Sequence, residues 1–487
     1  MSEWLLTPAS MGSGPLAVLT SVIYLFFLIY QVIVFGSYMS LNLIAFSIVR
    51  HVTRGGREMY LPRVYDAALP GVSILLTAYN EEKLIATSVR SLLQLNYPQF
   101  ELVVIHDGGN DDTIGIMIRE FAMEPCPMAF RYEVPCAPIK AVYRSLRFPN
   151  LVLIDKVNGG GKADANNAGI NVAKYPLYCG MDSDSVLERD SLLRVVRIFL
   201  EREDTIAAGG TVRIVNGCRV HNGQLANIGL PKSRLAKMQV LEYMRAFLFG
   251  RLGWSQLDAL LIISGAFGVF KRDTVIRVGG YKCNSLGEDM ELVVRLHRYH
   301  IENNLPYHIN FVPDPVCWTD APEDLSTLRK QRIRWQRGLL EVLSEHRSLC
   351  FRRGSGTVGW IAFPFMIVVE ALSPMVEILG FIFTVLLYYV GFLNPEAALM
   401  FFLATIGLGL VLSCSAILLE ERSFHVYPRF SDSINLFLWA ILENLGYRQL
   451  ISWWRLVGTW HWLIGKKASW GVMARSTSWV SEDSKGA

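Results

Sequence analysis

Hydrophobic and polar positions divide this chain into apolar ends and a mixed middle. Residues 16–49 contain no charged residue, and this run exceeds the ~20 apolar residues that a membrane-spanning helix needs. Residues 357–465 are again mostly apolar, whereas residues 51–324 have the pattern of a globular domain. The distribution predicts membrane helices at both ends of the chain and a folded domain between them.

We expect five segments along the chain. Residues 1–50 hold one long transmembrane helix, 51–324 a cytoplasmic domain, 325–356 a basic interfacial helix region, 357–465 a C-terminal transmembrane region and 466–487 a cytoplasmic tail. The cytoplasmic assignment follows the positive-inside rule, because only Glu3 precedes the first apolar run and four arginines follow it. These arginines are Arg50, Arg54, Arg57 and Arg63.

The C-terminal apolar region predicts two spans, at 358–393 and 397–419. The stretch 434–464 is either a hairpin of short spans or an interfacial helix followed by one span. Before this region, residues 325–343 combine five basic residues with Leu, Ile and Trp: Arg329, Lys330, Arg332, Arg334 and Arg337. That composition favours a helix on the cytoplasmic membrane face, with Arg332 and Arg337 free to face lipid headgroups. A solvent-exposed basic helix is the alternative.

The globular section alternates predicted strands and helices. Strands at 71–80, 100–105, 151–154 and one ending at Asp182 alternate with helices at 81–95, 112–123 and 162–174. This alternation predicts an α/β domain with a mainly parallel sheet. Ligands of such sheets bind at the carboxyl ends of the strands. Five polar residues fall at those ends: Thr77, Tyr79, Asp107, Asp182 and Asp184.

Further elements follow Asp182 in the same section. We expect helices at 191–203, 242–253, 287–298 and 325–343, a strand at 206–215, and an apolar segment at 261–270 that contains Ser264-Gly265-Ala266.

Asp182 and Asp184 are the first candidate metal ligands. Side chains two residues apart in extended backbone point to the same side, so both carboxylates can reach one cation. Hard divalent cations take oxygen ligands of this kind. A polar turn after a strand is the alternative for an isolated Asp-Ser-Asp.

Composition narrows the class of protein. The chain is 52% hydrophobic with a mean hydropathy of +0.30, which is too apolar for an ordinary soluble enzyme. The net charge of +4 gives no nucleic-acid-binding footprint. The eight cysteines include no Cys-x-x-Cys pair, which predicts reduced thiols in a cytosolic compartment rather than disulfides or zinc.

Glu370 and Glu377 are charged residues inside a predicted span. They are seven residues apart, so they share one helix face. Ionisable groups at membrane depth usually face a protein interior or a wet cavity. Two interpretations remain: a polar passage for a hydrophilic product, or carboxylates that lie near the interface or pair with arginines.

Six short motifs occur in order along the globular section. They are Thr77-Ala78-Tyr79-Asn80-Glu81, His106-Asp107-Gly108-Gly109, Gly161-Lys162-Ala163-Asp164-Ala165, Asp182-Ser183-Asp184, Gly287-Glu288-Asp289 and Gln331-Arg332-Ile333-Arg334-Trp335. This set, over roughly residues 70–340, resembles the membrane-embedded family 2 glycosyltransferases, such as the cellulose, hyaluronan and poly-N-acetylglucosamine synthases. The segment Trp470-Gly471 with Arg475 is similar to a C-terminal element of hyaluronan synthases.

The resemblance implies a glycosyltransferase A type α/β domain that binds a UDP-sugar and Mg²⁺ or Mn²⁺. Asp184, with Asp182, would hold the metal, which stabilises the charge on the departing diphosphate. Lys162 would meet the phosphates as a point charge. The donor-binding set would be Thr77, Tyr79, Glu81, Asp107, Lys162 and Asp182, with Asp107 facing the uracil ring.

The resemblance also implies the acceptor side of the site. Asp289 would be the catalytic base, and one base without a covalent nucleophile implies inversion. The remaining candidates for contact with acceptor or phosphate are Glu288, Gln331, Arg334, Trp335 and Arg475. Trp335 would offer an aromatic face to the acceptor sugar.

The leading hypothesis is a processive synthase that extends a polysaccharide and exports it across the membrane. Alternatives are a non-processive enzyme that glycosylates a membrane lipid, and a transporter or scaffold with an inactive transferase domain. The expected location is the plasma (inner) membrane, with the catalytic domain in the cytoplasm. The expected partners are a UDP-sugar, a polysaccharide or lipid acceptor and the bilayer, without nucleic acid.

Overall fold

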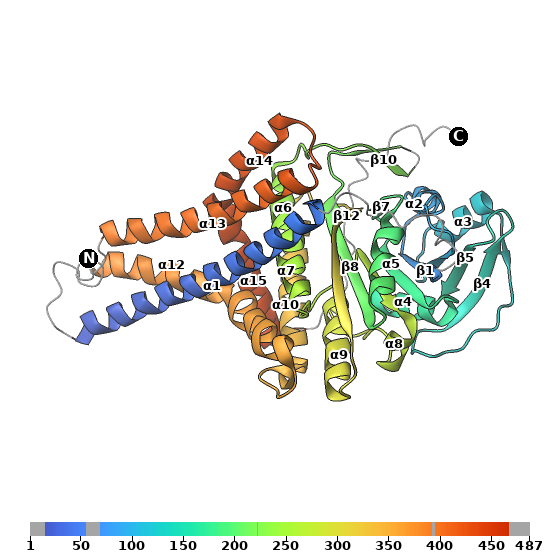
Figure 1. The fold of residues 1–487 in the computed structure, drawn as a ribbon, viewed down its shortest axis with the longest axis horizontal. Helices are drawn as coiled ribbons and strands as arrows, with labels where there is room; N and C mark the ends of the chain where they lie inside the picture. Colours follow the sequence, from blue (N-terminus) through green and yellow to red (C-terminus); the bar gives the residue numbers. More distant parts are fainter. Residues whose placement is uncertain (1–14, 55–68, 222, 392–394, 467–487) are drawn as a thin grey trace.

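The computed structural model describes residues 15–54, 69–221, 223–391 and 395–466. An α/β domain forms one part, and helices from both ends of the chain form the other (Figure 1). The three long helices α1 (Pro15–Arg54), α12 (Ser373–Val390) and α13 (Pro395–Ser423) project together away from the sheet. The two ends of the chain therefore meet in one helical region.

The centre of the α/β domain is a set of parallel strands. In spatial order they are β5 (Leu151–Lys156), β2 (Phe100–His106), β1 (Val72–Ala78) and β6 (Leu177–Asp182). These are the four strands expected from the alternating pattern, and their residues are buried almost throughout. Parallel strands covered on both faces read as continuous apolar runs, which is why the sequence identified them.

The complete sheet has ten strands and is mixed rather than mainly parallel. β11 (Phe267–Lys271) runs antiparallel between β6 and β8 (Thr205–Ile214), and β12 (His308–Thr319) lies parallel to β8. The edges are β7 (Val186–Leu187) on one side and β3 (Met123–Pro125) with β4 (Ile139–Ser145) on the other. A separate hairpin pairs β9 (Arg219–His221) with β10 (Gln224–Asn227). The α/β fold class is confirmed.

Short helices cover the sheet between its strands. They are α2 (Ile85–Leu92), α3 (Thr113–Phe121), α4 (Lys162–Val172), α5 (Ser191–Glu201) and α8 (Arg272–Arg277). In α5 the buried residues Leu192, Val195, Val196 and Phe199 recur at helical spacing, so one apolar face packs inward. Burying each such side chain contributes roughly 1.5–3 kcal/mol.

One continuous helical segment is longer than the predicted 242–253. It comprises α6 (Arg234–Tyr243), the π-helix η2 (Met244–Arg251) and α7 (Leu252–Gln256). Short π-helical turns are rare and frequently lie at functional sites. η2 contacts α1 and α13, so this segment joins the α/β domain to the helical part.

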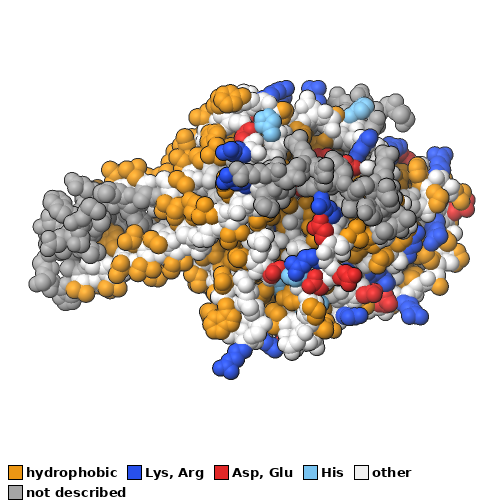
Figure 2. Space-filling view, viewed as in Figure 1, with side chains coloured by type: hydrophobic (Ala, Val, Ile, Leu, Met, Phe, Trp, Pro, Cys, Tyr) orange, Lys and Arg blue, Asp and Glu red, His pale blue; other side chains and the backbone are white. Residues whose placement is uncertain are grey.

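Two of the described helical segments are long and apolar enough to cross a membrane, namely Val18–Arg50 and Val358–Val390. They coincide with the predicted N-terminal span and with the first predicted C-terminal span. Residues 358–390 combine short π-helical and α-helical turns (η4, α11 and η5, Val358–Ala371) with α12. The visible face of the projecting helices carries hydrophobic side chains, whereas charged side chains gather over the α/β part (Figure 2). An exposed apolar surface of this extent marks contact with a membrane or a partner.

The last helices of the described chain are short. α14 (Phe430–Leu442) has 13 residues and α15 (Arg448–Leu463) has 16, with a kink at Leu445 and Gly446 between them. Both are shorter than the ~20 residues of a span. α15 packs along α10 (Leu325–Glu345), which follows the sheet. All eight cysteines are free thiols.

Candidate active site

A single large cavity of about 2190 Å³ follows the carboxyl ends of β1, β2 and β6 and continues among α10, α1, α12 and α15. Every predicted site residue within the described chain lines it. These are Thr77, Tyr79, Glu81, Asp107, Lys162, Asp182, Asp184, Glu288, Asp289, Gln331, Arg334 and Trp335. Arg475 lies outside the described residues. The fold thus places residues from six motifs that are far apart in the sequence on the wall of one cavity.

The register of the parallel strands explains why the candidate residues at the ends of β1, β2 and β6 lie together. Thr77 near the end of β1 pairs in register with Asp182 at the end of β6, and Ala78 pairs with His106 at the end of β2. Polar residues that follow these three strands therefore emerge side by side. Lys162 joins them because it is the first residue of α4, which begins directly after the glycines 159–161.

Lys162 links Asp182 to the turn that precedes β11. Its Nζ lies 2.5 Å from Oδ1 of Asp182 and donates a hydrogen bond of 2.7 Å to the carbonyl of Gly265. The amide N–H of Gly265 in turn donates to Oδ2 of Asp289 at 3.2 Å. One peptide segment thus holds both Lys162 and Asp289.

Asp289 occupies the first turn of α9 (Glu288–Glu302). Its Oδ1 accepts a hydrogen bond from the amide of Met290 at 2.8 Å. The first turn of a helix is a favourable place for an acidic side chain, because its backbone N–H groups and the positive end of the helix dipole point toward it. The preceding Glu288 is 8% exposed, and burial together with Asp289 raises its pKa to about 7, against the opposing influence of Lys162 and Arg334. Two adjacent carboxyl side chains thus line the cavity at the start of α9.

Asp107 is held by a residue that the sequence analysis did not identify. Its Oδ1 forms an ion pair with the fully buried Lys156 and accepts a hydrogen bond from the amide of Gly159 at 3.2 Å. Lys156 also lies 2.5 Å from Oδ2 of Asp164. Burial raises the pKa of Asp107 even though Lys156 acts in the opposite direction. The sequence feature that could have identified Lys156 is its place at the end of an apolar strand, because a lysine that is buried there requires an anionic partner.

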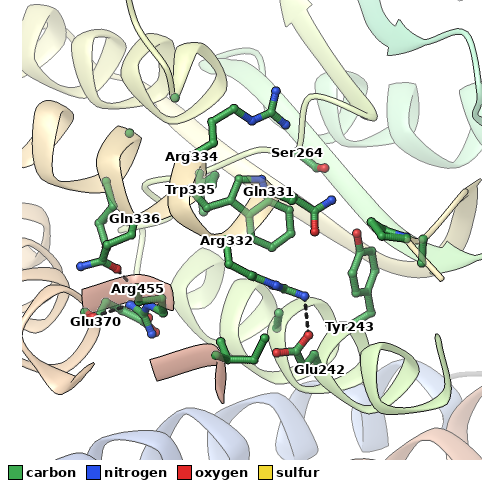
Figure 3. Close-up of a pocket in the computed structure, with 18 of the residues that line it drawn as sticks. Glu242, Tyr243, Ser264, Gln331, Arg332, Arg334, Trp335, Gln336, Glu370 and Arg455 are labelled. Atoms are coloured by element: carbon green, nitrogen blue, oxygen red, sulfur yellow. Dashed lines mark hydrogen bonds and ion pairs between the residues drawn. The ribbon is translucent and has the colours of Figure 1, made fainter. Parts of the chain in front are cut away.

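The motif Gln331–Trp335 lies on α10, whose first turn is capped by Asp324. The Asp324 carboxylate accepts hydrogen bonds from the amide of Thr327 at 2.8 Å and the hydroxyl of Ser326 at 2.7 Å. Farther along, Gln331 and Trp335 extend into the cavity beside Arg334 (Figure 3). Trp335 is 42% exposed, so its ring is available to a ligand.

The expectation that Arg332 faces lipid headgroups is wrong. Arg332 is 7% exposed and forms an ion pair of 2.5 Å with Glu242 on α6, while its guanidinium lies 4.4 Å from the Trp335 ring centroid (Figure 3). Glu242 also accepts a hydrogen bond from the hydroxyl of Tyr447 at 3.1 Å. Arg332 points inward because the partly buried carboxylate of Glu242 on the neighbouring helix compensates its charge.

The cavity continues into the helical part along polar groups. Gln336 accepts a hydrogen bond of 2.8 Å from Nε of Arg455, and Arg455 lies 3.6 Å from the carboxylate of Glu370 (Figure 3). Tyr38 on α1 donates to Glu370 at 2.5 Å. Glu377 accepts from the hydroxyl of Ser452 at 2.6 Å. The two interpretations of these glutamates are compatible, since Glu370 pairs with an arginine and both line the cavity.

The carboxylates after β6 fit a divalent cation by donor type and position. Both Asp182 and Asp184 line the cavity with oxygen ligands. Another group of potential ligands among the described residues, Glu291, Glu345 and His346, is already occupied by protein partners. Glu291 lies 2.8 Å from Arg295 and 3.3 Å from His346, so this group connects α9 to the end of α10.

Comparison with protein families identifies the class of protein to which this chain is similar. Residues 180–404 match the family described as "Glycosyl transferase family group 2", and residues 73–127 match "Glycosyl transferase family 2". The chain carries a family 2 glycosyltransferase domain. The two matched ranges contain the carboxyl ends of β1, β2 and β6, whereas Lys162 lies between them. The resemblance inferred from six motifs is thereby confirmed, as is the enzyme class.

The names of two similar proteins are consistent with this family assignment. The chain is 29% identical over 275 residues to a poly-beta-1,6-N-acetyl-D-glucosamine synthase of Staphylococcus epidermidis, covering 56% of this chain and 55% of that protein. It is 29% identical over 310 residues to the synthase of the same name from Staphylococcus aureus strain COL, covering 63% and 64%. The match thus spans about half of the first relative's length.

A solved structure supports the fold of the glycosyltransferase. A mannosyltransferase from Pyrobaculum calidifontis, determined with GDP-mannose and Mn²⁺, superposes with a TM-score of 0.50 at 17% identity. The superposition covers 90% of this chain and 99% of that one. It therefore includes helices outside the sheet as well as the α/β domain, and it confirms the glycosyltransferase A type fold.

Proposed function

We propose that the protein transfers a sugar, with inversion, from a UDP-sugar to the hydroxyl of a growing polysaccharide and passes the product into the helical part of its cavity. The observation that carries this proposal is the continuity of the cavity. Donor-side acids at the strand ends, Asp289, the Trp335 motif and the carboxylates among the long helices line one space. Synthesis and export would then share one site in the membrane.

The donor would lie across the carboxyl ends of β1, β2 and β6. Thr77, Tyr79, Glu81 and Asp107 would surround the nucleoside, with Asp107 fixed in place by Lys156. Lys162 would exchange its contact with Asp182 for the diphosphate. A divalent cation, Mg²⁺ or Mn²⁺, would supply further charge stabilisation to the departing diphosphate. We assign direct ligation of the cation to Asp184 and a donor-facing role to Asp182.

The acceptor hydroxyl would approach from the side of α9 and α10. Asp289 takes its proton while the hydroxyl oxygen forms a bond to the anomeric carbon of the donor sugar. The bond from that carbon to the diphosphate oxygen breaks, the electron pair leaves with the nucleoside diphosphate, and the configuration inverts. Arg334 and Gln331 would orient phosphate and acceptor, with Trp335 stacking on the acceptor sugar. Glu288 would modulate the local charge.

The domain organisation and location form part of the proposal. Residues 51–324 would be a cytoplasmic transferase domain, and residues 1–50 and 357–465 would anchor it in the plasma (inner) membrane. The two apolar helical segments and the hydrophobic surface of the projecting helices support this arrangement. Residues 325–356 would lie at the cytoplasmic face of the bilayer, with residues 466–487 in the cytoplasm.

A second candidate acceptor is a membrane lipid. Several aromatic side chains line the cavity among α1, α12 and α13, namely Phe27, Phe35, Phe381, Phe383 and Phe402. Such a wall would also accommodate an acyl chain. The same donor chemistry would then give one glycosylated lipid instead of a polymer.

The size of the product separates these functions. Purified protein would be incubated with Mg²⁺ or Mn²⁺ and a panel of labelled UDP-glucose, UDP-N-acetylglucosamine and GDP-mannose, and its products sized by gel and thin-layer chromatography. We expect polymer from a UDP-sugar. A single lipid-sized product would replace the polymer proposal with lipid glycosylation, and failure of every donor to react would contradict both.

A further inference from the structure

Arg251 lies in the cavity wall at the end of the π-helix η2, in none of the six motifs. Its Nη1 is buried and has no hydrogen-bond partner among the described residues. Native proteins pair nearly all buried N–H groups, so a buried unpaired donor in a ligand cavity calls for an acceptor from outside the protein. Five N–H groups in a planar fork make arginine well suited to oxygen-rich ligands.

Two aromatic rings position Arg251 on the same helix face. The guanidinium carbon lies 3.6 Å from the centroid of the Phe247 ring, and Phe247 stacks on Tyr243 with centroids 5.4 Å apart. All three residues line the cavity. Figure 3 shows Tyr243 pointing from its helix toward Gln331 of the acceptor motif. The row formed by Tyr243, Phe247 and Arg251 therefore faces the proposed acceptor side.

Two other arginines that line the cavity have counter-charges from the protein. Arg245, on the same π-helix, pairs with Glu443 and donates to the hydroxyl of Ser413 at 2.7 Å. Arg332 is paired with Glu242. Burial lowers the pKa of Arg251 to about 10, and the negative charge of Asp289 opposes that shift. Arg251 hence stays charged at neutral pH, within the electrostatic influence of Asp289.

We propose that Arg251, with the Tyr243 and Phe247 rings, forms a subsite for the acceptor sugar whose hydroxyl Asp289 deprotonates. Arg251 donates hydrogen bonds to an oxygen of this sugar, either a ring hydroxyl or an N-acetyl carbonyl. An aromatic surface beside a fixed donor is the usual composition of a small-molecule site. This inference rests on the proposed function for the identity of its ligand as a sugar chain.

Binding of oligosaccharides tests the subsite without requiring turnover. The purified full chain in detergent is titrated with glucose and N-acetylglucosamine tri- and pentasaccharides, followed by tryptophan fluorescence. Arg251→Met is expected to weaken binding at least tenfold, and Arg251→Lys, which keeps the charge without the fork, to give an intermediate loss. If wild type prefers the N-acetylated series, the N-acetyl carbonyl is the oxygen that accepts the hydrogen bond from Arg251. If wild type binds both series equally, a ring hydroxyl accepts that hydrogen bond.

Two measurements control for damage to the fold. Lys237→Met removes another cation-over-ring contact, 5.6 Å from the Trp439 centroid, outside the residues that line the cavity, and is expected to bind as wild type does. Affinity for UDP should be unchanged in every variant, because the donor lies at the strand ends. If Arg251→Met fails to fold and loses UDP binding, Arg251→Lys decides the question.

Several results would overturn the subsite. One is wild-type affinity of Arg251→Met for oligosaccharides, and another is a loss of UDP affinity equal to the loss of oligosaccharide affinity in a folded variant. A third is the absence of oligosaccharide binding by wild type. Failure of the proposed function is distinguishable, since it would appear as no turnover of any nucleotide sugar while the binding titrations still decide the role of Arg251.

Discussion

Gly338 on α10 packs against Gly287 so closely that a Cβ on Gly338 would lie 2.9 Å from the Gly287 nitrogen and 3.0 Å from its Cα. Gly287 is the N-cap residue of α9, the helix that begins with Glu288 and Asp289. Gly338 lies three residues after Trp335. The contact between two glycines therefore fixes the distance between the proposed base and the proposed acceptor platform.

Gly338→Ala should separate these two helices. The obstacle is backbone, which cannot rotate away as a flexible side chain would, so α9 and α10 must move apart by some tenths of an ångström. Misplacement of reacting groups on this scale is costly in catalysis, and we expect kcat to fall roughly 10–100-fold. Steady-state kinetics check this. Gly36→Ala, where no atom lies within 4 Å of the added Cβ, should retain wild-type kcat, and equal kcat in both variants would disprove the role of the contact.

Lys162→Met should impair the donor side. The ammonium that now lies 2.5 Å from Asp182 would no longer be available to the diphosphate, and loss of one such charge typically costs 10²–10³-fold in rate. We expect kcat/KM for the donor to fall by about that factor, measured by release of nucleoside diphosphate. Oligosaccharide binding should be unchanged, and a variant with normal donor kinetics would rule out contact between Lys162 and the phosphates.

The affinity for nucleoside diphosphate should depend on Glu288. Its pKa is raised by burial and by Asp289, so it is protonated at acidic pH and ionises as the pH rises through about 7. Ionisation adds a negative charge beside Asp289 and near Lys162 and Arg334, which disfavours an anionic ligand. We expect UDP binding, measured by calorimetry between pH 6 and 8.5, to weaken with rising pH more in wild type than in Glu288→Gln. Identical pH profiles would contradict this assignment.

Asp324 should make the stability of α10 dependent on pH in the acidic range. Hydrogen bonds from Thr327 and Ser326 lower the pKa of this N-cap to about 2 in the folded protein, below the ~3.9 of an unfolded chain. Its stabilisation is therefore complete above pH 4 and is lost as the pH falls toward 2. Asp324→Ala should lower stability by about 1 kcal/mol at pH 7.

The control for this prediction is Asp324→Asn, which keeps a good N-cap without a titrating group. In thermal denaturation at pH 7 we expect Asp324→Ala to melt a few degrees below both wild type and Asp324→Asn. Between pH 4 and 3 wild type should lose stability relative to Asp324→Asn. An unchanged melting temperature for Asp324→Ala would show that the cap does not limit the stability of the domain.

The sequence predicted those parts of the fold that carry a strong local pattern. The buried parallel strands and the alternating helices were predicted correctly because continuous apolar runs and turn residues mark them. β12 was missed because Pro313 and Pro315 interrupt its pattern, and its register with β8 shifts at Val312 and Pro315. β11 was placed in an apolar segment, but its antiparallel direction depends on tertiary pairing that no local pattern encodes.

The candidate site also contains residues that the sequence predicted and residues that it did not. The candidate site residues were identified from the sequence, and all of those within the described chain line the cavity. The partners that hold them were not identified, since they come from distant segments. Lys156 reaches Asp107 from the neighbouring strand, and Glu242 turns Arg332 inward from another helix. Buried ion pairs of this kind are visible only once the chain is folded.

Replacement of Asp289 by Asn tests the central claim most directly. Asn preserves the shape of the side chain but cannot take a proton from the acceptor hydroxyl. With a donor that wild type converts to product, Asp289→Asn should bind UDP with unchanged affinity and form product at least 10³-fold more slowly. Sugar transfer by Asp289→Asn at the wild-type rate would contradict the assignment of the base and, with it, this account of the site.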